Sequence, residues 1–224
     1  MMNYKKIRLL HVVFNTQIEA YELSAFRGAI IEKVGKENIL FHNHLSDSEF
    51  VYGYPLIQYM RVGRKPSVIC IEQGVNEMYK FFINKEWDMT MAGRKLQMNV
   101  SSMNLKDYTI KITGDQLNYR ISNWLALNQE NYPEYAKLTA ITDQVSKLEG
   151  ILTANILSFA KSIDWIITEP LKIKLTSVSP VKLLGYKGVK LSGFDATFNA
   201  NIMFPNYLGL GKGVSHGFGT VKQI

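Results

Sequence analysis

The chain has 224 residues, a formal net charge of +7 and one cysteine, Cys70. Its length suits one large domain or two small ones, and its 46% hydrophobic and 20% charged residues indicate a folded globular protein rather than a disordered chain. A single cysteine excludes an internal disulfide and a cysteine zinc cluster, and no stretch reaches the roughly 20 apolar residues of a membrane span or supplies the apolar segment of a signal peptide. We therefore expect a soluble cytoplasmic protein.

The first half of the chain predicts the order strand, helix, hairpin, helix, strand. A capping box, Thr16-x-x-Glu19, precedes apolar residues at helical spacing that continue to Gly35, and Gly63-Arg64-Lys65-Pro66 forms the turn of the hairpin. The expected elements are a strand at 5–14, a helix at 16–34, strands at 50–62 and 67–71, a helix at 74–84 and a strand at 96–113. This is the order of a ferredoxin-like domain, which we assign to residues 1–113.

The second half, residues 114–224, predicts a related but degenerate unit. Its expected elements are a strand at 119–127, helices at 130–140 and 142–161, and short strands separated by turns at Pro180, Gly185, Gly188 and Gly193. The fold class is therefore α+β, with two domains that meet near Gly114.

Positive charge is concentrated near the C-terminus. Between residues 171 and 224 seven lysines face a single acidic residue, Asp195, whereas the rest of the chain is close to neutral. Such a concentration is typical of a surface that binds a polyanion, although a solvated lysine-rich face is the more common origin of seven lysines taken alone.

Residues 209–219, which we call the glycine loop, carry five glycines in eleven residues. The spacing does not fit a P-loop, because Gly211-Lys212 is followed by Gly213, and it does not fit a dinucleotide fingerprint, because Val214 stands where the third glycine is needed. Glycine allows another backbone to approach closely, so the loop is suited to lie against a phosphate backbone. The alternative is a glycine-rich hairpin between two final strands.

Gly209-Leu210-Gly211 and Gly217-Phe218-Gly219 are separated by five residues. This arrangement closely resembles the glycine-rich loop of the RAMP superfamily of CRISPR-associated proteins, in particular the endoribonucleases that cut the CRISPR precursor RNA within each repeat. The resemblance implies tandem ferredoxin-like (RRM-like) domains. It also implies that the loop contacts RNA through Gly209, Gly211, Lys212, Gly217, Phe218 and Gly219.

Four histidines are candidates for chemistry, and two of them form a pair, His42-Asn43-His44. Alternate residues of an extended segment point the same way, so the two imidazoles can converge, and histidine can give and take protons near neutral pH. His11 and His216 are more simply a sheet residue and a surface-loop residue. The pair is also compatible with a metal site completed by Asp47 and Glu49, or with a polar loop of no catalytic role.

The resemblance gives the pair a catalytic role, because the catalytic histidine of these endoribonucleases follows the first helix, as His42 and His44 do here. The stretch from Tyr54 to Tyr59 is also similar to that of the type I-B branch. Arg61, Arg64 and Lys65 border the hairpin and are candidate phosphate contacts.

The expected activity is that of a metal-independent endoribonuclease, without a cofactor, that converts CRISPR repeat RNA to mature crRNA. The 2′-hydroxyl of the RNA attacks the neighbouring phosphorus and leaves a 2′,3′-cyclic phosphate and a 5′-hydroxyl. Besides crRNA, the resemblance implies other CRISPR effector-complex subunits as a class of partner. Two alternatives remain, namely a noncatalytic RNA-binding RAMP subunit of an effector complex and a metal-dependent hydrolase that uses His42 and His44 as ligands.

Overall fold

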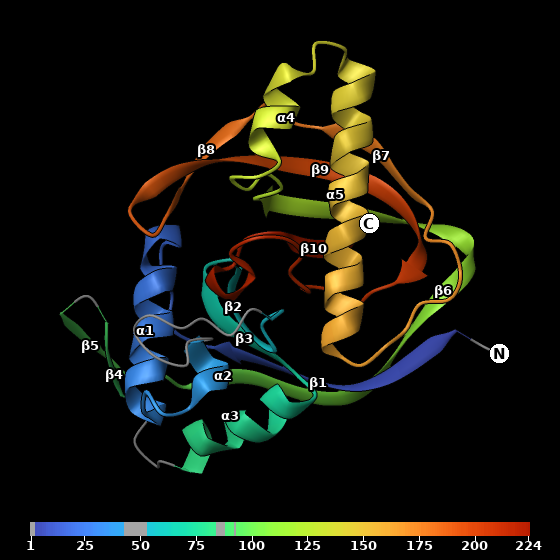
Figure 1. Ribbon diagram of the computed structural model, residues 1–224. Helices are drawn as coiled ribbons and strands as arrows, with labels where there is room; N and C mark the ends of the chain where they lie inside the picture. The colour runs from blue at the N-terminus through green and yellow to red at the C-terminus, as the bar shows by residue number, and fades with distance from the viewer. Residues whose placement is uncertain (1–2, 43–52, 84–87, 92) are drawn as a thin grey trace. The chain divides into compact units, whose positions relative to one another are not determined.

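A computed structural model describes residues 3–42, 53–83, 88–91 and 93–224 (Figure 1). The chain divides into two compact units. One contains residues 6–108 and 215–217, and we call it the N-unit; the other contains residues 1–5, 109–214 and 218–224, and we call it the C-unit. His44, Asp47 and Glu49 lie outside the described residues.

The N-unit is built on antiparallel strands in the order β2-β3-β1-β6. Their bounds are β1 Tyr4–Phe14, β2 Ile57–Val62, β3 Lys65–Ile71 and the first part of β6, Val100–Trp124. The predicted hairpin is confirmed, with Val62 opposite Lys65 and Ile57 opposite Cys70. Its first strand begins at Ile57, so the prediction that residues 53–56 belong to this strand is wrong. Pro55 lies just before the edge strand β2, where it removes no hydrogen bond from the sheet.

The helices of the N-unit pack on one face of these strands. They are α1 Leu23–Val34, α2 Ile39–His42 and α3 Gln73–Ile83, with a 3₁₀ turn at Ala20–Glu22. Because side chains alternate along a strand, Leu10, Val12 and Phe14 of β1 face this core, where the ring of Phe14 meets those of Phe26 and Phe81 edge-on.

The predicted start of the first helix is wrong. The Oγ1 of Thr16 donates to the carbonyl of Gln97 at 3.0 Å instead of capping a helix, and the reciprocal contact is made three residues later, where the N–H of Glu19 donates to the carboxylate of Glu22 at 2.8 Å. Helix α1 therefore begins at Leu23, and Tyr21 is left 82% exposed.

A small hairpin, β4 Met89–Met91 and β5 Arg94–Leu96, is absent from the sequence-based prediction. It is anchored by Met89 and Met91, which are buried in the core of the N-unit, and by an ion pair between Arg94 and the buried Glu22. Strands of three residues are too short to produce a recognisable alternation.

Strand β6 is continuous for 25 residues, so the prediction of separate strands at 96–113 and 119–127 is also wrong. The pairing of β6 with β9 shifts register between Ile112 and Leu117, so the ladder is irregular around Gly114. This irregularity coincides with the point at which the sequence looks interrupted. The assignment of the domain boundary to residues 113 and 114, which lie inside β6, stays a prediction.

In the C-unit, β6 pairs with β9 and β10, and β9 pairs with β7 and β8. The bounds are β7 Ile173–Val178, β8 Lys182–Tyr186, β9 Val189–Met203, β10 Thr220–Gln223, α4 Tyr132–Lys137 and α5 Ile141–Ser162. Tyr119 is central to the core: it stacks on Phe198, and its hydroxyl donates to the carbonyl of Ile202 at 3.0 Å.

Helix α5 is fixed to β7 through Glu149, which accepts a hydrogen bond from the N–H of Leu175 at 2.9 Å. The predicted amphipathic character of α5 is confirmed for Leu148, Leu152, Ile156 and Phe159, which are buried, whereas Leu157 is 46% exposed. Among the described residues no helix has the length and apolar character needed to cross a bilayer.

Candidate functional site

His42 ends α2, a helix of four residues that begins at Ile39. Its Nε2 lies 2.5 Å from the carbonyl oxygen of Lys36. Because a carbonyl oxygen only accepts hydrogen bonds, Nε2 carries the proton in this contact. In the neutral imidazole the lone pair is then on Nδ1, so Nδ1 is the nitrogen that can take up a proton.

Two side chains hold the backbone around His42. Arg27 of α1 donates from Nη2 to the carbonyl of His42 at 2.9 Å, and the hydroxyl of Tyr59 of β2 donates to the carbonyl of Phe41 at 3.3 Å. The guanidinium of Arg27 also lies 5.9 Å from the centroid of the Tyr59 ring. These contacts fix the direction of the last turn of α2 and with it the position of the imidazole.

Tyr59 is suited to this role because it is fully buried. Burial raises the pKa of Tyr59 well above its ordinary value and outweighs the opposing effect of Arg27, so the phenol remains a neutral donor. Neither Arg27 nor Tyr59 was predicted from the sequence as a site residue. The available signal was an arginine inside the otherwise apolar or glycine-containing stretch 25–31 of α1, where a charge needs a partner.

The second histidine of the pair, His44, lies outside the described residues, as do Asp47 and Glu49, so the convergence of the two imidazoles stays a prediction. Within residues 3–42, 53–83, 88–91 and 93–224, no group of three or more histidine, cysteine or acidic residues is arranged to hold a metal ion.

His11 is a satisfied sheet residue, as expected. Ser67 donates to the carbonyl of Val12 at 3.0 Å, so the hydroxyl of Ser67 accepts from Nε2 of His11, 2.6 Å away. Burial, with a smaller effect of Lys106, lowers the pKa of His11, which favours the neutral ring.

The three basic residues at the β2–β3 hairpin already have protein partners. Arg61 donates from Nη1 to the carbonyl of Ile18 at 2.9 Å, and both Arg61 and Arg64 form ion pairs with Glu19. Lys65 donates to the hydroxyl of Ser101 at 3.2 Å. Their contact with phosphate stays a prediction, and for Arg61 and Arg64 it would have to compete with a carboxylate.

The glycine loop is tied to the end of β6. The N–H of Gly219 donates to the carbonyl of Asn123 at 3.2 Å, and the N–H of Leu210 donates to the carbonyl of Gly219 at 2.8 Å. The loop uses the left-handed backbone region that favours glycine at four positions, namely Gly211 (φ 96°), Gly213 (φ 74°), Gly217 (φ 83°) and Gly219 (φ 65°).

The protein's own atoms occupy the space that side chains would need at these glycines. A Cβ on Gly211 would lie 2.9 Å from Nε1 of Trp124, a Cβ on Gly217 would lie 2.6 Å from Cδ2 of Leu23, and a Cβ on Gly219 would overlap the carbonyl oxygen of Leu210. The close approach that the sequence suggested is therefore made, in these directions, by the chain itself. Contact of Gly209, Gly211, Gly217 and Gly219 with RNA stays a prediction.

Lys212 and Phe218 of the loop point toward another feature, the β8–β9 hairpin. The ammonium of Lys212 lies 5.8 Å from the centroid of the Tyr186 ring, and the ring of Phe218 meets that of Tyr186 edge-on at 5.8 Å. Lys212 is exposed, so the loop presents its charge beside an aromatic ring.

This architecture, two ferredoxin-like domains with a glycine-rich loop near the C-terminus, is that of the RAMP superfamily of CRISPR-associated proteins, and the resemblance seen in the sequence is confirmed. Residues 5–109 match the Cas6b N-terminal domain, and residues 111–224 match the Cas6b C-terminal domain. The chain belongs to the Cas6b family.

Three relatives illustrate the similarity. A crystal structure of Cas6b is 30% identical, with a TM-score of 0.87 over 98% of this chain and 100% of that chain. A crystal structure of a CRISPR RNA processing endoribonuclease Cas6b is 26% identical, with a TM-score of 0.75 and the same coverage. An uncharacterized protein of Methanocaldococcus jannaschii is 36% identical over 145 residues, which cover 57% of this chain and 95% of the relative.

Proposed function

We propose that this protein is an endoribonuclease that binds CRISPR repeat RNA and cleaves it to give mature crRNA. The observation that carries the proposal is the match to both Cas6b domains, which together extend from residue 5 to residue 224. The geometry of His42 supports it, because an imidazole at a helix end with a defined Nε2–H is a suitable proton carrier.

In the proposed chemistry the protein contributes only proton transfer, because the RNA supplies the attacking oxygen. One imidazole of the pair His42 and His44 removes the proton of a ribose 2′-hydroxyl, and the oxygen attacks the adjacent phosphorus. The bond from phosphorus to the 5′-oxygen breaks, and the other imidazole, as imidazolium, gives its proton to that oxygen. The products are a 2′,3′-cyclic phosphate and a 5′-hydroxyl, and no metal ion or water is consumed.

Binding in this proposal depends on the C-unit. Its lysines are in large excess over acids, and Lys212 and Phe218 place charge and an aromatic ring beside the β8–β9 hairpin. Positive charge near aromatic side chains on which bases can stack is a common way to hold single-stranded RNA. The N-unit, by contrast, supplies His42 and the side chains that hold it.

The test is cleavage of the repeat RNA from the protein's own locus, followed by analysis of the product ends. A single 2′-deoxy nucleotide just upstream of the cut should abolish cleavage and leave binding intact, because it removes the attacking group. Cleavage should also persist in EDTA. If cleavage tolerates the deoxy nucleotide and stops in chelator, the attacking group is a metal-activated water, and His42 and His44 act as metal ligands rather than as proton carriers. A protein that binds but never cuts would be a noncatalytic RAMP subunit.

A further inference from the structure

The C-unit contains a pocket of about 610 Å³ between the segment that leads into α4 and the β8–β9 hairpin. Its volume lies in the range of about 300 to 1,000 Å³ that is common for small-ligand sites. All the lining residues belong to the C-unit, and they are Leu127, Asn128, Gln129, Tyr132, Leu183, Tyr186, Lys187, Val189, Lys190, Leu191, Ser192 and Lys212.

The pocket has exposed apolar side chains. Leu183 is 69% exposed, Val189 is 55% exposed and Tyr132 is 50% exposed, whereas Leu127, which also lines the pocket, is buried. Apolar side chains gathered at one concave place on a surface are typical of a binding site rather than of an ordinary solvated strand.

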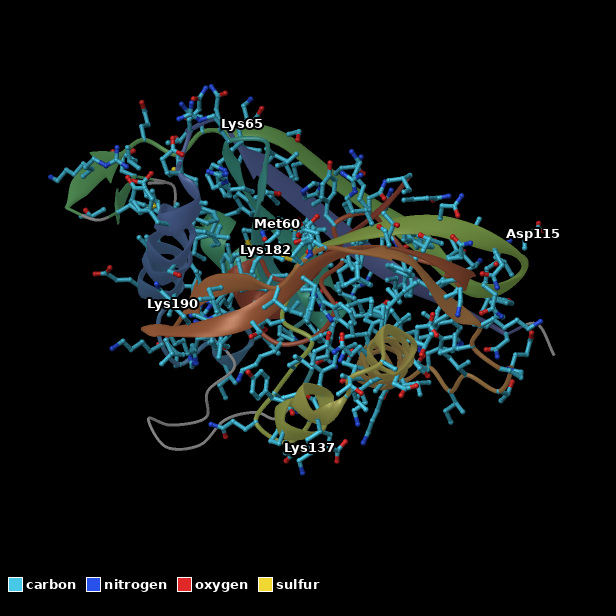
Figure 2. The ribbon with its side chains drawn as sticks, turned by 90° about the horizontal axis from the view of Figure 1, so that it is seen from above. Met60, Lys65, Asp115, Lys137, Lys182 and Lys190 are labelled. Carbon is cyan, nitrogen blue, oxygen red and sulfur yellow. The ribbon has the colours of Figure 1, made fainter. Side chains whose placement is uncertain are left out.

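The polar part of the pocket is cationic. Lys187, Lys190 and Lys212 line it, and none of the lining residues is acidic. Lys182 lies on the same hairpin as Lys190 (Figure 2) and forms an ion pair with Asp195. The three lining lysines place positive charge beside the apolar surface of the pocket.

The aromatic ring of Tyr186 connects the two parts. The ammonium groups of Lys187 and Lys212 each lie 5.8 Å from its centroid, and Phe218 of the glycine loop packs against it edge-on. The turn of the hairpin is tight, with positive φ at both Lys187 and Gly188, which matches a type I′ turn and fixes where the lysines emerge.

We propose that this pocket binds one unpaired nucleotide of the RNA, with the base against Leu183, Val189 and Tyr132 and the phosphate toward the lysines. A nucleotide combines a flat apolar face, polar edges and a negative charge. Gln129 and Ser192 supply donors and acceptors for the edges of the base. The Oδ1 of Asn128 already accepts hydrogen bonds from the N–H groups of Glu130 and Asn131, so Asn128 contributes only its Nδ2 as a donor. This inference rests on the proposed function, since it identifies where part of the RNA is held, apart from the histidine pair.

The experiment measures binding by full-length protein carrying His42→Ala, which removes cleavage from the readout. In Leu183→Asp a carboxylate enters the pocket, and the dissociation constant for repeat RNA should rise about 10-fold or more. The matched control is Val181→Asp, because Val181 is 53% exposed, lies just before β8 and does not line the pocket. The control places the same charge nearby and should change the dissociation constant by less than threefold.

A second measurement identifies the occupant. Each unpaired base of the repeat is replaced in turn by an abasic site; at one position the loss should weaken binding by about 10-fold to 100-fold, the range for a stacked base. The same abasic RNA should bind Leu183→Asp no more weakly than intact RNA does. If no position shows this coupling, or if Leu183→Asp and Val181→Asp behave alike, the pocket does not hold a nucleotide. A pocket that instead binds an acidic peptide of a partner protein would show no coupled abasic position.

The two proposals fail separately. RNA that is cut normally by the wild-type protein but shows no coupled abasic position would overturn the pocket and leave the endoribonuclease intact. RNA that is bound with the predicted coupling but never cut would overturn the endoribonuclease and leave the pocket.

Discussion

The glycine loop, residues 209–219, and the α2 segment, residues 36–42, are held in place by opposite means. In the loop the backbone is confined by the protein's own atoms at the positions where side chains would stand. In the α2 segment the backbone is short and is fixed by side chains that reach it from α1 and β2. Changes in the loop should therefore affect folding first, whereas changes in the α2 segment should affect chemistry first.

The largest expected effect sharpens the second half of this comparison. His42→Ala and His44→Ala should each slow cleavage on the order of 10²-fold to 10⁴-fold, because each removes a proton carrier, while RNA affinity stays nearly normal. Single-turnover cleavage and filter binding measure the two quantities. Asn43→Ala, between them, is the matched control and should cut at nearly the wild-type rate. Near-normal cleavage by both histidine variants would assign the chemistry to other residues.

Gly219→Ala tests the expectation that changes in the glycine loop affect folding first. The added Cβ would overlap the carbonyl oxygen of Leu210 at a backbone φ of 65°, so the free energy of unfolding should fall by about 3 kcal/mol or more. Gly188→Ala is the control, because Gly188 has a φ of 80° and nothing within 4 Å of the Cβ position. It should lose only about 1 kcal/mol, the cost of the backbone conformation alone.

Urea unfolding measures both variants. If Gly219→Ala is as stable as the wild-type protein but no longer binds RNA, the glycine faces the RNA and the assignment of the loop to internal packing is wrong.

The loss of cleavage rate expected for Arg27 variants is smaller than that for the histidine variants. Arg27 contacts the backbone of His42 rather than the substrate. Arg27→Met keeps most of the apolar stem but loses the hydrogen bond, and it should slow cleavage by about 10-fold to 10²-fold by displacing the imidazole. Arg27→Lys keeps a donor and a charge and should recover part of that loss.

The control for Arg27 is Lys33→Met, because Lys33 is a charged residue of the same helix, and its Nζ donates to the backbone carbonyl of Asp88. It should cleave like the wild-type protein. The pH profile of cleavage separates positioning from general destabilisation: a displaced imidazole should shift the profile, whereas a protein that is merely partly unfolded should lower the rate equally at all pH values.

The smallest expected effect concerns charge at the loop. Lys212→Gln should reduce the slope of log affinity against log salt by about 0.7, the contribution of one phosphate on a single strand. Lys80→Gln on α3 makes the same change in net charge, but Lys80 is paired with Glu77, so its slope should not change. Equal slopes for the two variants would mean that Lys212 acts only through the total charge.

The sequence was sufficient for most elements of the fold because their signals are local. Apolar periodicity located α1, α3 and α5, and the glycine turn located the β2–β3 hairpin. The prediction failed where a distant partner decides the local structure. The hydroxyl of Thr16 donates to the carbonyl of Gln97 instead of capping a helix. Strand β6 continues past Gly114 because it pairs with β9 on both sides of the register shift.

The candidate site was predictable only in part, for a similar reason. A histidine pair and a glycine pattern can be read from a linear sequence, but the partners that place His42 come from Arg27 and from Tyr59, 17 residues after it in the chain. The glycines illustrate the converse. Their number indicated a close approach correctly, but whether the approaching atoms belong to a ligand or to Trp124, Leu23 and Leu210 depends on the folded structure.

The membership of residues 215–217 in the N-unit has a consequence for biosynthesis. The ribosome makes residues 6–108 before residues 109–214, and only then the tripeptide that packs beside Leu23 and the carbonyl of Tyr59. Domains usually fold one after another as they emerge. Here the earlier unit must wait for the later one to be translated before it acquires its last piece. A nascent chain stalled before residue 215 should therefore hold an N-unit that is more open to proteases than the same unit in the finished protein.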